Sequence, residues 1–280
     1  MKIRRIVSIL LASLLVLSIS AAFADEIPSP SGDDKTIVIG ASAVPHEEII
    51  EGVVRAKLEA AGWTLEVKPF TDYVLPNTAL EDGELDANYF QTWHYLVEQN
   101  EVRGLHLVEV LGIHLEPMGL YSSKYASVDE IADGATVAIP NDGSNESRAL
   151  KLLADNGLIT LSETDDLYDL SHVEENPKNI TFYELAAEQI PHNLADVDAA
   201  VINGNYALES GLNPATDALV IESATSDESY KYINYLVVRE GNENSLKTQA
   251  LIAAFSSQDV VDFINEKYPG SVIPSSDLVK

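Results

Sequence analysis

The chain has 280 residues, 46% of them hydrophobic, and a formal net charge of −28, so it can form a globular protein with a sizeable core. The negative charge argues against nucleic acid and anionic membrane surfaces as partners, because both repel an acidic protein. The absence of cysteine excludes disulfides, thiolate metal sites and a cysteine nucleophile, and leads us to expect no lipid-modified cysteine.

The first 24 residues have the pattern of a secretory signal peptide. Basic residues precede the apolar run 6–19, which is too short for a comfortable membrane span, and Ala22-Phe23-Ala24 forms a cleavage site. We therefore expect a mature chain that begins at Asp25 and is exported, either free in a periplasm or on the outer face of the cell membrane. An uncleaved N-terminal anchor is the alternative.

Strands and helices alternate along the rest of the chain, after a polar tether at 25–34. The pattern predicts strands at 36–40, 64–67, 85–89, 136–139, 179–182, 198–202, 218–221 and 232–238. It predicts helices at 47–61, 72–80, 91–103, 147–156, 185–194, 203–210, 244–255 and 258–267, and a short one after the capping box at 127–130. This alternation indicates an α/β fold with mostly parallel sheets.

Two stretches interrupt the alternation and suggest a division into two lobes. One is the extended stretch near 115–122, and the other is the polar stretch 223–231. If the chain crosses between lobes at both places, lobe 1 comprises 35–118 and 229–280, and lobe 2 comprises 119–228. A ligand would then bind between the lobes, beside the carboxyl ends of the strands.

One strand–turn–helix corner offers a site for an anion. The apolar strand 136–139 runs into Pro140-Asn141-Asp142-Gly143, and a helix follows with Arg148 near its start. Unpaired backbone N–H groups and the positive end of a helix dipole suit a carboxylate, and a guanidinium can hold one with two parallel hydrogen bonds. The alternative is an ordinary turn with an arginine on the surface.

Three further polar clusters follow predicted strand ends. They are Thr71-Asp72-Tyr73, the run 88–94 (Asn-Tyr-Phe-Gln-Thr-Trp-His), and Asn203-Gly204-Asn205-Tyr206. The amide oxygen of Asn203 would accept a hydrogen bond from an ammonium, and Tyr73, Phe90 and Trp93 would enclose an apolar side chain or a thioether. Core packing of the aromatic residues and helix capping by the asparagines are the alternatives.

No enzyme or metal-binding motif is present. The chain lacks G-x-S-x-G, P-loop, H-E-x-x-H and G-x-G-x-x-G patterns, and its six histidines are scattered without metal-ligand spacing. Of the six, His106 and His114 are the pair that could share a region. We expect no catalytic residue, no cofactor and no metal; the alternative of another class is a secreted hydrolase that uses a carboxylate in the cleft.

Several motifs occur in one order and resemble a known family. They are Phe70-Thr-Asp-Tyr-Val-Leu-Pro-Asn77, Leu85-Asp-Ala-Asn-Tyr-Phe-Gln91, Glu116-Pro-Met-Gly-Leu-Tyr121, Ile139-Pro-Asn-Asp142 with Asn145 and Arg148, Val173-Glu-Glu-Asn-Pro-Lys-Asn179, and Ala200-Val-Ile-Asn-Gly-Asn-Tyr-Ala207. Over residues 36–275 the chain is similar to the methionine-binding (MetQ-type) NLPA lipoprotein family. The resemblance implies a two-lobed periplasmic binding protein (type II-like) that closes on L-methionine and delivers it to an ABC permease driven by a cytoplasmic ATPase.

The resemblance also implies roles for individual residues. Arg148 would bind the carboxylate of the ligand, Asn145 and Asn203 its polar end, and Tyr73 and Phe90 its side chain. The resulting candidates are Tyr73, Phe90, Thr92, Asn141, Asn145, Arg148 and Asn203, and a second group contains Tyr89, Trp93, His94 and Tyr206.

Two features depart from the family pattern. The family usually has histidine two residues after the pocket phenylalanine and proline two residues later, where this chain has Thr92 and His94. A pocket changed there could accept a Met-containing dipeptide or another apolar amino acid instead of methionine. The family is also typically anchored by a lipid on cysteine, which this chain lacks.

Overall fold

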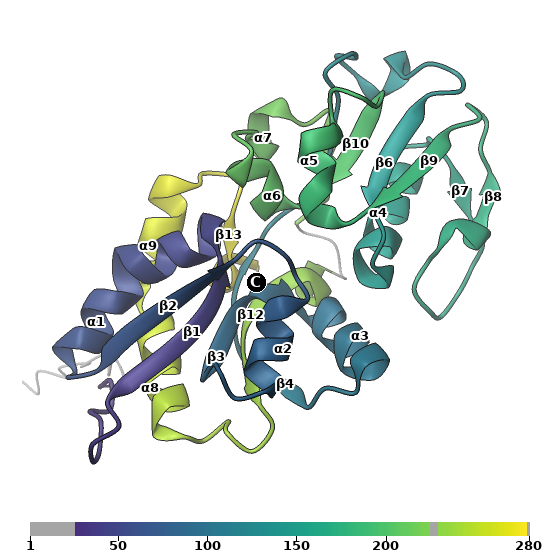
Figure 1. Cartoon of the computed structure of the whole chain (residues 1–280). Coiled ribbons are helices and arrows are strands. Elements are labelled where there is room, and N and C mark those ends of the chain that lie inside the picture. Colours follow the sequence, from purple (N-terminus) through teal and green to yellow (C-terminus); the bar gives the residue numbers. More distant parts are fainter. Residues whose placement is uncertain (1–25, 225–228, 279–280) are drawn as a thin grey trace, which may run out of the picture.

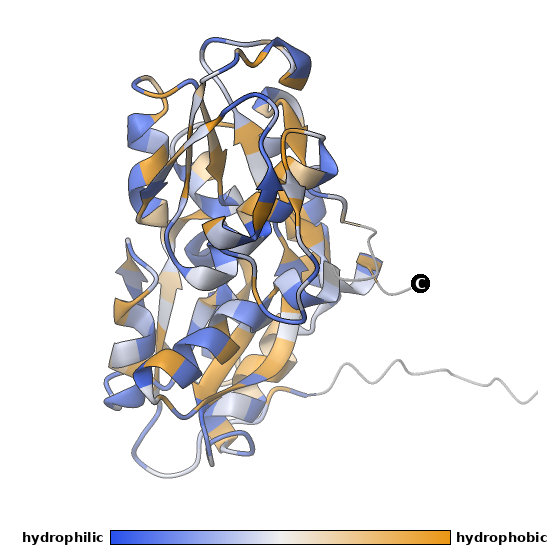
Figure 2. Cartoon of the chain, turned by 90° about the vertical axis from the view of Figure 1, so that its right-hand side faces the viewer, coloured by the Kyte–Doolittle hydropathy of each residue, from blue (hydrophilic) through white to orange (hydrophobic). Residues whose placement is uncertain are grey.

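The computed structural model describes residues 26–224 and 229–278, so the expected signal peptide lies outside the described residues. Two lobes, each built around one large β-sheet, are visible in Figure 1. The apolar strands lie inside each lobe and the helices present polar faces outward (Figure 2). Within the described residues, no helix has the length and apolar character needed to span a membrane.

The first sheet has the strand order β13-β4-β12-β3-β1-β2. Its strands are β1 (Thr36–Ser42), β2 (Thr64–Phe70), β3 (Ala87–Thr92), β4 (Leu107–Leu115), β12 (Ile233–Arg239) and β13 (Ile273–Pro274). The pairings show that β1 to β4 run in one direction and that β12 and β13 run in the other.

Helices cover both faces of this sheet because successive strand residues point to opposite sides. The helical elements are η1 (Ala43–Glu47), η2 (Ile50–Val54), α1 (Arg55–Ala60), α2 (Leu75–Glu81), α3 (Trp93–Arg103), η6 (Ser229–Tyr232), α8 (Leu246–Phe255), α9 (Gln258–Lys267) and α10 (Ser275–Leu278). Ile37 and Ile39 pack with residues of α1, α8 and α9, whereas Val38 between them packs with residues of α2 and α3 on the other face.

The second sheet has the strand order β11-β5-β10-β6-β9, in which β5 alone runs against the others. Its strands are β5 (Gly119–Tyr121), β6 (Thr136–Pro140), β9 (Thr181–Leu185), β10 (Ala199–Ile202) and β11 (Val220–Ile221), and β7 (Thr160–Leu161) pairs with β8 (Val173–Glu175) in a separate ribbon. The helical elements are η3 (Val128–Glu130), α4 (Gly143–Asp155), η4 (Leu170–His172), η5 (Ala187–Gln189), α5 (Ile190–Asn193), α6 (Gly204–Glu209) and α7 (Pro214–Asp217). Val137 and Ile139 face α4, and Ala138 faces α5.

The predicted two-lobed α/β fold is confirmed. Most strands of each sheet run in one direction, but β12 and β13 in the first sheet and β5 in the second run against them, so both sheets are mixed. The ribbon of β7 and β8 was missed, because its strands have only two and three residues and lie among turn-forming residues. The predicted helix at 91–103 begins at Trp93 instead, since Gln91 and Thr92 continue strand β3.

The chain passes from the first sheet to the second between Leu115 and Gly119, and it returns between Ile221 and Ile233. Both passages fall in the stretches for which crossings are predicted. The expected tether carries no helix or strand, but it contacts the first lobe, because Trp63 Nε1 donates to the carbonyl of Pro28 (2.7 Å). The predicted lobe limits at 118/119 and 228/229 stay a prediction.

Candidate ligand-binding site between the lobes

A cavity with about 330 Å³ of empty space lies between the two sheets. It is lined by Tyr73, Phe90, Gln91, Thr92, Tyr95, Glu116, Asn145, Arg148, Asn203, Gly204, Asn205 and Asn234. These residues come from β3, from α3, from β12, from the first crossing and from the starts of α4 and α6. The cavity therefore has walls from both lobes and from the segment that joins them.

Arg148 is buried beside this cavity, with 4% of its surface exposed, so the alternative of a surface arginine is wrong. Its Nε and Nη2 atoms donate to the two carboxylate oxygens of Glu222 (2.7 and 2.6 Å). Nη2 also donates to the carbonyl of Glu116 (2.7 Å), and the guanidinium lies 4.4 Å from the ring centre of Tyr232. Among the described residues, only Nη1 of this guanidinium lacks a hydrogen-bond partner.

Glu222 connects the two crossings as well as holding Arg148. Its Oε2 accepts from the backbone N–H of Met118, and its own N–H donates to the carbonyl of Met118 (both 2.9 Å). One ion pair thus joins helix α4 to both connections between the lobes. The positive charge of Arg148 is already balanced by a carboxylate of the protein.

The start of α4 also holds a carboxylate of the protein. The backbone N–H groups of Gly143 and Ser144 donate to the two oxygens of Glu98 on α3 (2.9 and 3.0 Å). The sequence of this corner predicts a site for an anion, and the corner does bind one, but the anion is a side chain from the opposite lobe. This contact closes the two lobes against each other.

A chain of amide contacts leads from α4 to the cavity. Asp142 accepts from both the backbone N–H and the Nδ2 of Asn145 (3.0 and 2.8 Å), and Asn145 Oδ1 accepts from Asn203 Nδ2 (2.8 Å). These bonds fix the orientation of the Asn203 amide. Its Oδ1 is buried and has no hydrogen-bond partner among the described residues, so it offers an acceptor to a bound ligand.

Asn205 offers a donor in the same cavity. Its Oδ1 accepts from the hydroxyl of Tyr73 (2.5 Å), and its buried Nδ2 has no partner within the described part of the chain. Burial raises the pKa of Tyr73 well above its usual value, so this phenol stays neutral and remains a donor. Asn203 and Asn205 therefore offer the cavity one buried acceptor and one buried donor without a partner.

The opposite wall is aromatic. The ring of Tyr73 lies 5.8 Å from that of Phe90 and 5.5 Å from that of Tyr95, and the Phe90 and Tyr95 rings are 6.2 Å apart. Thr92 completes this wall and caps α3, because its hydroxyl accepts from the N–H of Tyr95 (3.4 Å). Three ring faces suit an apolar side chain or a thioether.

The structure brings together Tyr73, Phe90, Thr92, Asn145, Arg148 and Asn203, as the sequence suggested, and places the other five candidates elsewhere. Asn141 is exposed, because the next residue, Asp142, turns inward to cap α4. Tyr89 is in the core of the first lobe. Trp93 and His94 line a separate cavity, and Tyr206 packs behind Tyr73 with its hydroxyl on the carbonyl of Thr71 (3.1 Å).

Five side chains of this site were missed as candidates. They are Gln91, Tyr95, Glu116, Asn205 and Asn234. Asn234 had a usable signal, since a polar amide in the apolar strand 232–238 needs a buried partner. Its Oδ1 lies 3.0 Å from His46 Nε2.

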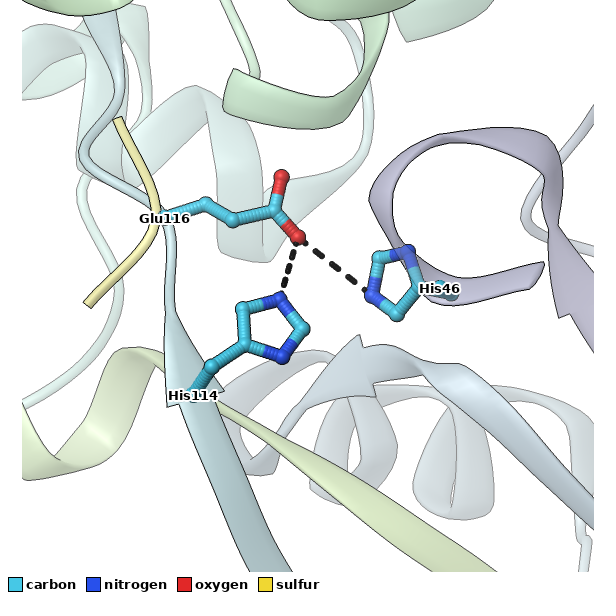
Figure 3. Close-up of side chains that lie close together, drawn as sticks. All are labelled: His46, His114 and Glu116. Carbon is cyan, nitrogen blue, oxygen red and sulfur yellow. Dashed lines mark hydrogen bonds and ion pairs between the residues drawn. The ribbon is translucent and has the colours of Figure 1, made fainter. Parts of the chain in front are cut away.

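Two histidines meet at Glu116, as Figure 3 shows. Nε2 of His114 lies 2.7 Å from Glu116 Oε1, and Nε2 of His46 lies 3.3 Å from the same atom. Pairing His106 with His114 was wrong, because His106 is exposed and contacts Glu81. Burial lowers the pKa of His46 to about 4 and that of His114 to about 3, and burial raises the pKa of Glu116 to about 6. At neutral pH the cluster is therefore a carboxylate between two neutral imidazoles.

Two α/β lobes with two crossings and a polar cavity between them define the class of two-lobed substrate-binding proteins. The model of the NlpA lipoprotein family matches residues 37–276, and the chain belongs to this family. The predicted family is thus confirmed, and so is the prediction that the chain is not an enzyme.

Relatives cover most of the chain. The methionine-binding lipoprotein MetQ of Bacillus subtilis is 39% identical over 95% of this chain and 97% of its own length. A nutrient-binding protein from Burkholderia cenocepacia, solved bound to methionine, is 40% identical with a TM-score of 0.80, covering 85% of this chain and 99% of that one. A periplasmic substrate-binding protein of an ABC transporter from Coxiella burnetii is 37% identical with a TM-score of 0.80, over 85% and 100% of the two chains.

Replacing Arg148 by methionine should destabilise the fold by about 3–5 kcal/mol, because the change leaves the carboxylate of Glu222 buried without its partner. Urea denaturation measures this loss. The double variant Arg148→Met/Glu222→Gln removes both charges and should recover part of the stability. An Arg148→Met midpoint equal to that of the wild type would contradict the importance of this ion pair.

Proposed function

We propose that this protein binds L-methionine between its lobes as the substrate-binding component of an ABC importer. The observation that carries the proposal is the pair of unpaired amide atoms, Asn203 Oδ1 and Asn205 Nδ2, which share one cavity with Arg148 and an aromatic wall. An acceptor and donors on one side, and an apolar wall on the other, match an amino acid with an apolar side chain. Two relatives support this assignment, because one is named a methionine-binding lipoprotein and the other was solved bound to methionine.

In this arrangement each part of the ligand has a partner. The ammonium donates to Asn203 Oδ1, and the carboxylate accepts from Arg148 Nη1 and Asn205 Nδ2. The thioether lies against Tyr73 and its neighbouring rings. An unsatisfied buried polar group costs about 1–3 kcal/mol, so a ligand that pairs both amides removes this cost when it binds.

Binding is coupled to closure of the lobes, because the partners come from both sides. The aromatic wall belongs to the first sheet and its helices, and the amides belong to α4 and the start of α6. A ligand that contacts both walls binds the closed state better than an open one, and it therefore shifts the population toward closure. A permease can distinguish the loaded from the empty protein by this difference in shape.

The residues that line the cavity fit more than one ligand with an amino group and an apolar side chain. The alternatives are a Met-containing dipeptide or another apolar amino acid, because Thr92 is shorter than the family's histidine and leaves more room in the wall.

A thermal-shift panel should show that L-methionine stabilises the protein more than other amino acids, glycylmethionine and divalent metals do. A ligand present at about 1,000 times its Kd stabilises the folded state by about 4 kcal/mol, which is several degrees in Tm for a chain of this size. A larger shift with the dipeptide or with another apolar amino acid would replace methionine by that ligand. No shift with any member of the panel would refute amino-acid binding.

Asn203→Ala should weaken methionine binding by roughly 10- to 100-fold, the range expected for one lost hydrogen bond to a charged group. Calorimetric titration measures the change in Kd. Asn141→Ala is the matched control, because Asn141 is also an asparagine at a strand–helix corner but is exposed and lies outside the cavity. Equal affinities of the two variants would exclude Asn203 from the ligand site.

We also propose that the protein acts outside the cytoplasm, in a periplasm or on the outer face of the membrane, and delivers its ligand to an ABC permease with a cytoplasmic ATPase. Deleting its gene should lower the uptake of labelled methionine, and the wild-type gene should restore uptake whereas the Asn203→Ala gene should not. Protease treatment of intact spheroplasts should digest the protein. Unchanged uptake after deletion would argue against a role in methionine import.

A further inference from the structure

Glu116, in the first crossing between the lobes, places its carboxylate at the cavity. The basic side chains around this carboxylate are either paired with another acid or neutral. The guanidinium of Arg148 is paired with Glu222, and the imidazoles of His46 and His114 are neutral at pH 7. Glu116 is therefore the charge in this group that no cation of the protein neutralises through a side-chain ion pair. Only its backbone carbonyl contacts Arg148.

One oxygen of this carboxylate is held by the two imidazoles. The carboxylate and the amide oxygen of Asn234 can only accept hydrogen bonds, so His46 and His114 both carry their proton on Nε2. Their Nδ1 atoms then accept from the hydroxyls of Ser42 (2.9 Å) and Tyr89. Each imidazole nitrogen has a partner. The Nε2–H of His114 donates to Glu116 Oε1, whereas that of His46 donates to Asn234 and lies 3.3 Å from the same oxygen of Glu116.

The second oxygen, Oε2, has no hydrogen-bond partner among the described residues. It lies beside Gly204, because a Cβ added at this glycine would be 3.0 Å from Oε2 and 2.7 Å from the Cβ of Glu116. Gly204 directly follows Asn203, whose Oδ1 is the unpaired acceptor of the cavity. Glu116 and Asn203 both line the cavity, so a ligand there can meet one charged and one neutral acceptor.

We propose that Glu116 Oε2 is the charged partner of the ligand's primary ammonium, and that His46 and His114 are positioning residues that hold this carboxylate. The inference rests on the proposed amino-acid binding and deepens it. The ligand ammonium then meets a full negative charge, whereas Arg148, whose Nε and Nη2 already bind Glu222, has only Nη1 left for the ligand carboxylate. Ligands that keep the amine and lose the acid, such as amides and esters of methionine, belong to the accepted class.

The hydrogen bonds favour this role over a metal site. The three ligand atoms of His46, His114 and Glu116 lie within 4.8 Å of one another, which alone would suit a metal ion. Yet the 2.7 Å between His114 Nε2 and Oε1 is a normal hydrogen-bond length, and the ring nitrogens that a metal would need already have partners.

Calorimetric titrations should compare L-methionine, its amide, and the des-amino acid 3-(methylthio)propionate on the wild type and on Glu116→Gln. The variant should bind L-methionine and the amide roughly 30-fold or more weakly, the scale for truncating a buried charge pair. Its affinity for the des-amino acid should be unchanged or better, since that ligand has no ammonium to lose. An equal loss for all three ligands, or no loss, overturns the role of Glu116. If the wild type binds none of them, the proposed function itself fails.

The pH dependence of binding tests the positioning role, and it also serves if Glu116→Gln does not fold. The titratable and charged groups around the carboxylate are His46 on η1, His114 on β4, Tyr89 on β3, Arg148 on α4 and Tyr73 before α2. Methionine affinity of the wild type should fall as the pH drops through about 6, where Glu116 takes up a proton. His114→Phe removes a donor to the carboxylate and should move this fall to higher pH. An identical profile in that variant overturns the positioning role.

Zinc ion alone provides the test against a metal site. The wild type and His114→Phe are treated with EDTA and titrated with Zn²⁺. The two proteins should give the same result. One equivalent of tightly bound zinc that disappears in this variant would overturn the assignment, because the imidazoles would then serve a metal rather than the carboxylate.

Discussion

The buried ion pair between Arg148 and Glu222 is the constraint on which the rest of the site depends. It joins helix α4 to both connections between the lobes, so it fixes where the second lobe stands over the first sheet. Because the ion pair neutralises the guanidinium of Arg148, it also weakens the attraction of this group for a ligand carboxylate. A buried charge pair contributes little net stability compared with an apolar pair, but it strongly penalises any arrangement in which one partner is left alone. That penalty specifies one geometry for the cavity.

The buried polar atoms that have no hydrogen-bond partner within the described residues indicate which ligand would fit. Of the buried side-chain polar atoms in the described residues, three lack a partner, and two of these, in Asn203 and Asn205, line the cavity. Buried polar groups in folded proteins are nearly always paired. Two unpaired polar atoms in one cavity therefore indicate a binding site for a molecule with a complementary donor and acceptor. The third, the hydroxyl of Tyr121, packs over Gly119 outside the cavity, and nothing in the structure explains it.

Local patterns made the fold and part of this site predictable. The alternation of apolar runs gave the strands, and the corner at 135–148 followed from turn residues between a strand and a helix. Contacts between residues far apart in the sequence could not be predicted from local patterns. Glu222 lies 74 residues from Arg148, and Glu98 reaches α4 from the opposite lobe. The choice of Asp142 over Asn141 as the inward side chain depends on which residue caps α4, and an Asn-Asp pair in a turn does not reveal this.

Two carboxylates of the protein, Glu98 and Glu222, neutralise the start of α4 and Arg148. The lobes can therefore close while the cavity keeps its capacity to bind a ligand. Glu98 pairs with the start of α4 and Glu222 pairs with Arg148, so the closed cavity contains no unpaired positive charge. Tyr73 likewise donates to Asn205 across the cleft (2.5 Å), and Tyr206 donates to Thr71. The groups that remain unmatched are one neutral donor, Asn205 Nδ2, and acceptors at Asn203 and Glu116. The charged acceptor is the property that separates an amine from the many anions of the surroundings. Selectivity in this site therefore follows from which charges the protein has already neutralised.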